Sequence, residues 1–296
     1  MNPVLRACTA AVTVWLVLST APSRADEPGA DPALTQQPDP ALKKLLPAGR
    51  DSQAFTLAVS LGSPPDDFRD DKGQIVGWEI DLARAATQLL GLPLEIRPTT
   101  FDSLIPGLQA KRFDAATGQM GVSVTRGKVV DQIGWLTGNE LFAAKSTSAI
   151  KVEGLDDLCG ITVATTRGSR EMVFAEEHQS KCAAAGKKPI EALAFNDGNG
   201  AAEAMMSGRA EVFWLGSTAV AYFVAQTKGR THVVGHYTDT SYIGIALPKG
   251  SDLAKPFQAA LEALHANGGY DKIVKKWGLE DGAVKSFPLN PTNIEK

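Results

Sequence analysis

Apolar residues between Gly77 and Arg126 change repeatedly from helical to strand spacing. Gly91 predicts the end of a first helix, in which six apolar residues recur at helical intervals: Ile80, Leu82, Ala83, Ala86, Leu89 and Leu90. A short strand begins at 94–96, a second helix covers 104–109, and 113–117 has the pattern of a buried strand. Two successive helix–strand units predict an α/β fold.

The same alternation continues through the second half of the chain. Strands are expected at 56–60, 161–164, 190–195 and 211–215, and helices at 169–182, 200–207, 217–226, 253–266 and 270–277. Four further extended segments have no helix between the members of each pair: 133–136 with 141–145, and 232–234 with 242–247. A chain of this length usually divides its core between two domains.

The first 25 residues have the features of a secretory signal peptide. Arg6 precedes an apolar run at 7–18, and the small residues at 21–25 offer a cleavage site before Asp26. The apolar run is about a dozen residues, shorter than the ~20 that span a bilayer. An uncleaved anchor is the alternative. A Pro- and Asp-rich flexible leader is expected at 26–50, and an irregular tail at 286–296.

Two cysteines remain once the signal peptide and its Cys8 are removed. Cys159 and Cys182 in an exported chain fit one disulfide, which would close a loop of about 20 residues. Two free thiols are the alternative. The four histidines have no ligand spacing, and two cysteines without a clustered histidine do not make a metal site, so no metal is expected.

Charge and composition restrict the class of partner. The net charge is −3 and no dense basic stripe occurs, which argues against a nucleic-acid partner. Apolar residues make up 44% of the chain, an ordinary share for a globular protein. No cofactor is expected. The chemistry of the chain therefore has to be sought in its motifs.

The stretch described first resembles the family 3 extracellular solute-binding proteins, the amino-acid receptors of bacterial ABC importers. That family has a G-F-x-x-D-L helix, an aromatic–x–x-L-I-P-x-L helix, F/Y-D-A, a Gly-x-Met turn and then an arginine. In this chain the matching elements are Gly77–Leu82, Phe101–Leu108, Phe113–Ala115, Gly118–Met120 and Arg126. The resemblance extends from about Phe55 to Gly278.

The resemblance implies a two-lobed periplasmic-binding-protein fold of type II, with two α/β domains joined by a two-segment hinge. Lobe 1 would comprise 51–143 plus 243–285, and lobe 2 would comprise 144–242. Such lobes close around a ligand by hinge bending. Small-molecule sites commonly lie between domains.

In lobe 1 the resemblance implies that Arg126 pairs with a ligand carboxylate, for which a planar guanidinium is well shaped. Its place beyond the carboxyl end of a strand is consistent with that role. Phe101 would pack on the ligand, and Gly118, Gln119 and Gly121 would line the site; the family usually has Ser or Thr where Gly121 stands. The alternative for Arg126 is a solvated arginine at a helix end, and the alternative for Phe101 is an aromatic residue of the core.

In lobe 2 the run through Gly168, Ser169 and Arg170 resembles the family's second carboxylate-binding segment. That segment opens a helix, where free N–H groups bind anions. Arg170 stands where the family has Thr or Ser. It either adds charge to the site or points to solvent.

Gly216 departs from the family most clearly, because an aspartate there commonly accepts the ligand α-ammonium. Burying an ammonium without a counter-charge is costly. Either another acid substitutes for it or the ligand lacks a standard α-amino group. The candidate acids are loop residues near the expected cleft: Asp66, Asp67, Asp197 and Asp239. Three arginines, Arg126, Arg167 and Arg170, favour an anionic ligand.

The function implied by the resemblance is capture of an amino acid or related carboxylate by a periplasmic monomer, which delivers it to a membrane permease. Binding alone is expected, without catalysis. One alternative is a sensory module that presents its liganded state to a signalling partner. Another is a dehydratase on the same scaffold, for which Asp197 is the one candidate acid.

Overall fold

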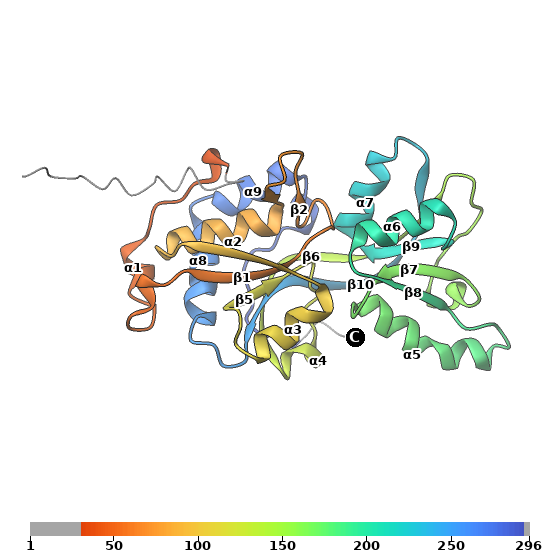
Figure 1. The fold of residues 1–296 in the computed structure, drawn as a ribbon, viewed down its shortest axis with the longest axis horizontal. Helices are drawn as coiled ribbons and strands as arrows, with labels where there is room; N and C mark the ends of the chain where they lie inside the picture. Colours follow the sequence, from red (N-terminus) through yellow and green to blue (C-terminus); the bar gives the residue numbers. More distant parts are fainter. Residues whose placement is uncertain (1–30, 293–296) are drawn as a thin grey trace, which may run out of the picture.

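The structure is a computed structural model that describes residues 31–292, apart from the side chains of Pro32 and 238–240. The predicted signal peptide lies outside these residues. Figure 1 shows two groups of helices and strands side by side, here called lobe 1 and lobe 2. The α/β class and the two lobes are as predicted. No helix within 31–292 is both long enough and apolar enough to cross a membrane.

Lobe 1 is built on three parallel strands, in the order β4 (Leu94–Thr99), β1 (Phe55–Ser60) and β5 (Ala115–Thr117). Alternate residues of β1 enter different cores. Leu57 and Val59 pack in the larger core with α2 (Trp78–Leu89), α8 (Ala254–Ala266) and α9 (Gly269–Trp277). Ala58 packs on the other face with α3 (Phe101–Gln109). A small hairpin, β2 (Phe68–Arg69) and β3 (Ile75–Val76), precedes α2.

Lobe 2 repeats this arrangement with a second set of parallel strands, β8 (Glu191–Phe195), β7 (Thr162–Thr166) and β9 (Val212–Gly216). Trp214 and Val163 pack in one core with α5 (Arg170–Ala184) and the turn η4 (Leu155–Leu158). Phe213 and Ala164 pack on the opposite face with α6 (Gly198–Ser207) and α7 (Ser217–Gln226). Period-2 alternation along the strands therefore produces both cores.

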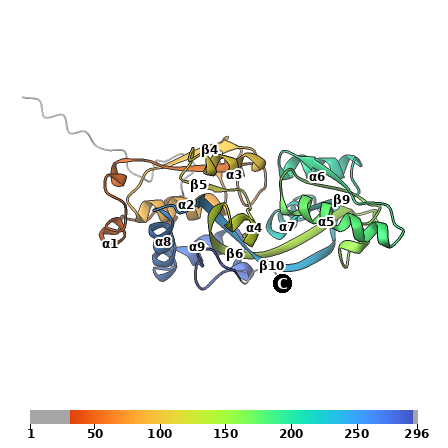
Figure 2. The same cartoon turned by 90° about the horizontal axis from the view of Figure 1, so that it is seen from below.

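Two long antiparallel strands connect the lobes (Figure 2). These are β6 (Val130–Lys145) and β10 (Thr231–Pro248). The sequence predicted a pair of separate extended segments in each. The pairing instead continues between them, with shifts of register between Tyr237 and Ser241 and between Ile243 and Gly244. Gly244 has no room for a side chain, since a Cβ there would lie 2.3 Å from the carbonyl oxygen of Ile133.

The segments before and after the lobes pack against lobe 1. The predicted leader, 26–50, contains η2 (Pro32–Leu34) and α1 (Pro40–Lys43), and η3 (Arg50–Ser52) begins at its last residue. A flexible segment was expected here, but two long-range contacts hold these helical turns against lobe 1. Asp39 N donates to Leu89 O at 2.8 Å, and Arg50 pairs with Asp114 at 2.7 Å. After η5 (Glu280–Gly282), Phe287 is buried in the larger core.

Candidate ligand-binding site

A cleft lies between the lobes and is lined by residues of both and of the two crossing strands. It holds about 550 Å³ of space, open solvent included. Eight of the ten predicted binding residues line it: Phe101, Gly118, Gln119, Gly121, Arg126, Ser169, Arg170 and Gly216. Gly168 and Asp197 do not. The fold therefore brings most of the predicted set together, although their roles in binding stay predictions.

Arg126 extends from the short helix α4 (Val124–Gly127) toward the cleft. Its backbone N–H donates to Ser123 Oγ at 3.2 Å, which caps the helix. Its guanidinium donates to the carbonyl oxygen of Gly121 at 2.7 Å and lies 5.5 Å from the ring centre of Phe101. Burial lowers the pKa of Arg126 to about 10, with Glu171 acting in the opposite direction. The guanidinium is therefore charged at neutral pH and available to an anion.

Gln119 takes a left-handed backbone conformation with φ 55°, and its N–H donates to Glu79 Oε2 at 2.9 Å. Its side-chain amide crosses to lobe 2 and donates to Thr218 Oγ1. This places the amide beside Gly216, where a side chain at that position would otherwise lie. The departure of the sequence at Gly216 is thus matched by Gln119, which fills the vacated space with a neutral group.

Arg170 points into the cleft. It is the first residue of α5, and Ser169 caps that helix by accepting from Met172 N at 3.4 Å. Its guanidinium donates to Glu140 Oε1 at 2.5 Å and to Ser241 Oγ at 2.7 Å, and it lies 5.3 Å from the ring centre of Phe174. The solvent-facing alternative is wrong, because β6 and β10 supply partners that the local sequence does not reveal.

The two predicted residues outside the cleft lie where the lobes touch. Gly168 has φ 73°, and a Cβ there would lie 3.1 Å from the Cβ of Asp102 in lobe 1. Asp197 caps α6 by accepting from Gly200 N at 2.8 Å. Next to it, Asn199 N donates across the lobes to Gly62 O at 2.9 Å. Both residues are thus part of the contact between the lobes.

Asp66 and Asp67 also lie outside the cleft lining, fully buried beside Glu79. Burial raises the pKa of Asp66 and of Asp67 well above the usual value, and the Glu79 carboxyl adds to this. Asp66 Oδ1 accepts from Trp78 Nε1 at 2.5 Å. The side chain of Asp239 lies outside the described residues. Asp66 and Asp67 are therefore poor substitutes for an acid at position 216.

Among the described residues, the acids that line the cleft are Glu140 of β6 and Glu171 of α5. No motif in the sequence points to Glu140, which lies between the extended segments predicted at 133–136 and 141–145. Glu171 directly follows Arg170 in the chain, and no pattern in the sequence singles it out. Arg167 is exposed and donates to Ala194 O at 3.4 Å, so it does not add charge to the cleft. Of the three arginines that favoured an anionic ligand, Arg126 and Arg170 line the cleft, and Arg170 is paired with Glu140.

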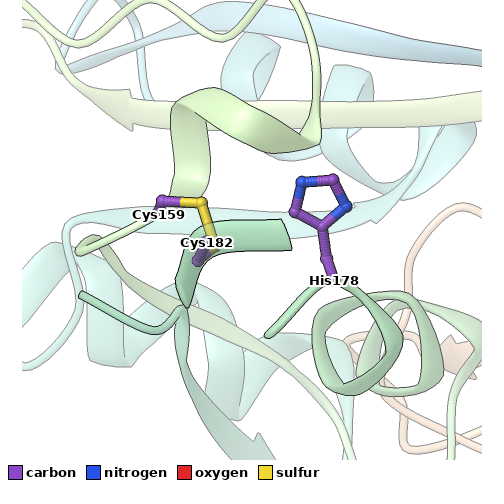
Figure 3. A group of neighbouring side chains, drawn as sticks. All are labelled: Cys159, His178 and Cys182. Carbon is purple, nitrogen blue, oxygen red and sulfur yellow. A yellow bond between two sulfur atoms is a disulfide. The ribbon is translucent and has the colours of Figure 1, made fainter. Parts of the chain in front are cut away.

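Cys159 and Cys182 form a disulfide, as predicted (Figure 3). The structure also places His178 beside them, with one atom of each of the three side chains within 4.8 Å of the others. The expected absence of a clustered histidine is thus wrong. The two sulfur atoms are bonded to each other, however, and His178 Nε2 is 2.5 Å from Asp156 Oδ1. The group in its oxidised form is a structural crosslink.

Residues 55–280 match the family described as bacterial extracellular solute-binding proteins, family 3. The chain belongs to this family. The arginine-binding protein ArgT of Corynebacterium glutamicum is 28% identical over 87% of the chain and 85% of its own length. The ABC transporter glutamine-binding protein GlnH of Bacillus subtilis is 30% identical over 81% of the chain and 87% of its own length.

Two solved structures have the same fold. An ancestral arginine-binding protein bound to arginine matches with a TM-score of 0.68 and 29% identity, over 76% of the chain and 97% of its own. The ancestral amino-acid-binding protein AncCDT-1, a precursor of cyclohexadienyl dehydratase, matches with a TM-score of 0.68 and 27% identity, over 80% of the chain and 99% of its own. The structural neighbours of the chain thus include an arginine-binding protein and an amino-acid-binding precursor of an enzyme.

Proposed function

We propose that this protein is the substrate-binding receptor of an ABC importer and captures an amino acid or a related carboxylate between its lobes. The observation that carries the proposal is Arg126, a charged guanidinium that lines the interlobar cleft above the ring of Phe101. Arginine presents parallel N–H groups that fit a carboxylate. The relatives ArgT, an arginine-binding protein, and GlnH, a glutamine-binding protein, support the same ligand class.

Ligand contacts with both lobes would drive such a receptor from its open to its closed form. A ligand that touches Arg126 in lobe 1 and the start of α5 at Ser169 in lobe 2 binds the closed form better than the open form, which is the differential affinity that closure requires. The closed protein would then dock on a permease as a monomer. Export through the signal peptide would place it in the periplasm.

A thermal-shift screen of residues 26–296 with amino acids, dicarboxylates, opines and amines tests the proposal. A ligand that binds only the folded state raises the melting temperature by mass action. We expect at least one carboxylate to do so and to be recovered unchanged after incubation. A screen in which no carboxylate binds, or in which a bound acid is converted to product, contradicts a receptor without catalysis.

A further inference from the structure

The disulfide of lobe 2 lies beside a histidine, and together the three side chains have the composition of a metal site (Figure 3). One sulfur or ring nitrogen atom from each of Cys159, His178 and Cys182 lies within 4.8 Å of the others. His178 and Cys182 are four positions apart on α5, so they share one face of that helix. Cys159 directly follows η4 and reaches this face from a different element.

The disulfide does not need His178, which nevertheless is buried beside it. His178 is only 6% exposed, and Cys182 is fully buried. The ring atom Nε2 lies 2.5 Å from Oδ1 of Asp156, whose side chain is 77% exposed. Burying a polar ring is costly unless a hydrogen bond compensates, and an apolar side chain would avoid that cost. The chain thus places an imidazole and a carboxylate next to two sulfur atoms, and these are the ligand types of zinc.

The spacing of these atoms is close to that of a tetrahedral zinc site. Zinc binds sulfur at about 2.3 Å and nitrogen or carboxylate oxygen at about 2.0–2.2 Å, so neighbouring ligand atoms lie about 3.3–3.8 Å apart. The sulfur and nitrogen atoms are already within 4.8 Å of one another. Once the S–S bond is broken, rotation of the two cysteine side chains can bring the sulfur atoms to this spacing. Asp156, already against His178, completes a set of four ligands.

We propose that reduction of the disulfide creates a zinc site formed by Cys159, Cys182, His178 and Asp156. A dithiol reductant supplies two electrons and two protons, so that the S–S bond breaks, both sulfur atoms become thiols and the reductant becomes a disulfide. Zinc then binds the two sulfur atoms as thiolates and displaces their two protons. The oxidised protein offers no thiolate and therefore lacks the site.

The zinc ion would connect the same two elements as the disulfide does. In both redox states η4 stays attached to α5, through a covalent bond in one and through the ion in the other. An ion that binds only the folded chain stabilises it by mass action, so zinc should offset the loss of the disulfide. None of the four ligand residues lines the interlobar cleft, and the inference does not depend on the proposed receptor function.

Zinc titration of oxidised and reduced residues 26–296 tests the inference, because this part of the chain contains only these two cysteines. The reduced sample is freed of reductant under argon and titrated with zinc in competition with a chromophoric chelator. We expect one ion per reduced chain, bound at least 100-fold more tightly than by the oxidised chain. Zinc should also raise the melting temperature of the reduced chain, and EDTA should reverse that rise. Equal zinc binding by the two forms overturns the inference.

His178→Gln distinguishes this site from binding by two thiolates alone. We expect the reduced variant to bind zinc at least tenfold more weakly than reduced wild type. His236→Gln, which changes an exposed histidine of β10, is the matched control and should bind like wild type. Asp156→Asn should weaken zinc binding at least fivefold. Unchanged zinc affinity in His178→Gln or in Asp156→Asn overturns the assigned set of ligands.

X-ray absorption spectroscopy of zinc-loaded, reduced wild type tests the same ligand set without any variant. We expect two sulfur ligands and two nitrogen or oxygen ligands around each ion, at the distances of a four-coordinate site. A shell of oxygen alone, or four sulfur ligands shared between two chains, overturns the inference.

Discussion

The side-chain amide of Gln119 occupies the space beside the α-carbon of Gly216. A Cβ built on Gly216 would lie 2.6 Å from Gln119 Nε2 and 2.9 Å from Oε1. The two residues come from different lobes, and the amide also donates to Thr218 of α7. The identity of residue 216 therefore determines whether Gln119 can hold the lobes together.

Gly216→Ala should disturb this contact. Because the end of the Gln119 side chain can move away, the expected cost is the lost bond to Thr218, about 1 kcal/mol in the free energy of unfolding. Gln119→Gly removes the obstructing side chain and tolerates the positive φ. In that background Gly216→Ala should cost close to nothing, as measured by urea unfolding in a double-mutant cycle. Gly154→Ala, where a Cβ meets no atom within 4 Å, is the control. Strictly additive effects would contradict the relationship.

The buried acids Asp66, Asp67 and Glu79 should make stability depend on pH. The raised pKa of Asp67 means that the folded protein retains a proton which the unfolded chain loses near pH 4. This contribution to stability is complete below the unfolded pKa and is lost as pH rises through the folded pKa. Asp67→Asn cannot ionise, so it should gain stability over wild type between pH 5 and pH 8.

We expect that gain to reach about 1 kcal/mol or more, because one pKa unit corresponds to about 1.4 kcal/mol. Urea unfolding of both proteins at pH 5 and pH 8 measures it. Asp71→Asn, an exposed acid in the turn between β2 and β3, should show no such trend. A gain for Asp67→Asn that is the same at both pH values would refute the origin assigned to it.

The disulfide should be a large single contribution to the stability of lobe 2. Cys159 and Cys182 are separated by 23 positions, for which the chain-entropy relation gives about 3 kcal/mol. The double variant Cys159→Ala/Cys182→Ala should lose roughly this amount in urea unfolding. Dithiothreitol should lower wild-type stability in the same way and leave the variant unaffected. Equal stability of oxidised and reduced wild type would argue against a structural crosslink.

Local patterns were sufficient for most of the longer helices and strands, and insufficient for the short elements and for the way the elements pair. The helix at 217–226 has the bounds that its apolar spacing predicted. The strands β6 and β10 were predicted in pieces, because polar and glycine residues interrupt their period where the strands cross between the lobes. Pairing with each other, which is a long-range interaction, keeps them continuous.

The same limit applies to the cleft. Arg126 and the glycines near it lie within one stretch of chain and carry a recognisable motif. Glu140 and Arg170 are 30 positions apart and form an ion pair that no spacing indicates. The positive charge expected from Arg170 is therefore neutralised by a residue that only the folded chain brings into reach.

Isothermal titration of the best carboxylate ligand into Arg126→Gln tests the central claim most directly. A charge-assisted, bidentate pair that is lost in a buried cleft should raise the dissociation constant by about 100-fold, or roughly 3 kcal/mol. Arg126→Lys retains the charge without the planar pair of N–H donors, so its dissociation constant should lie between those of wild type and Arg126→Gln. Arg167→Gln, on the exposed turn of lobe 2, should bind like wild type. A dissociation constant for Arg126→Gln within threefold of wild type would contradict the role given to this guanidinium.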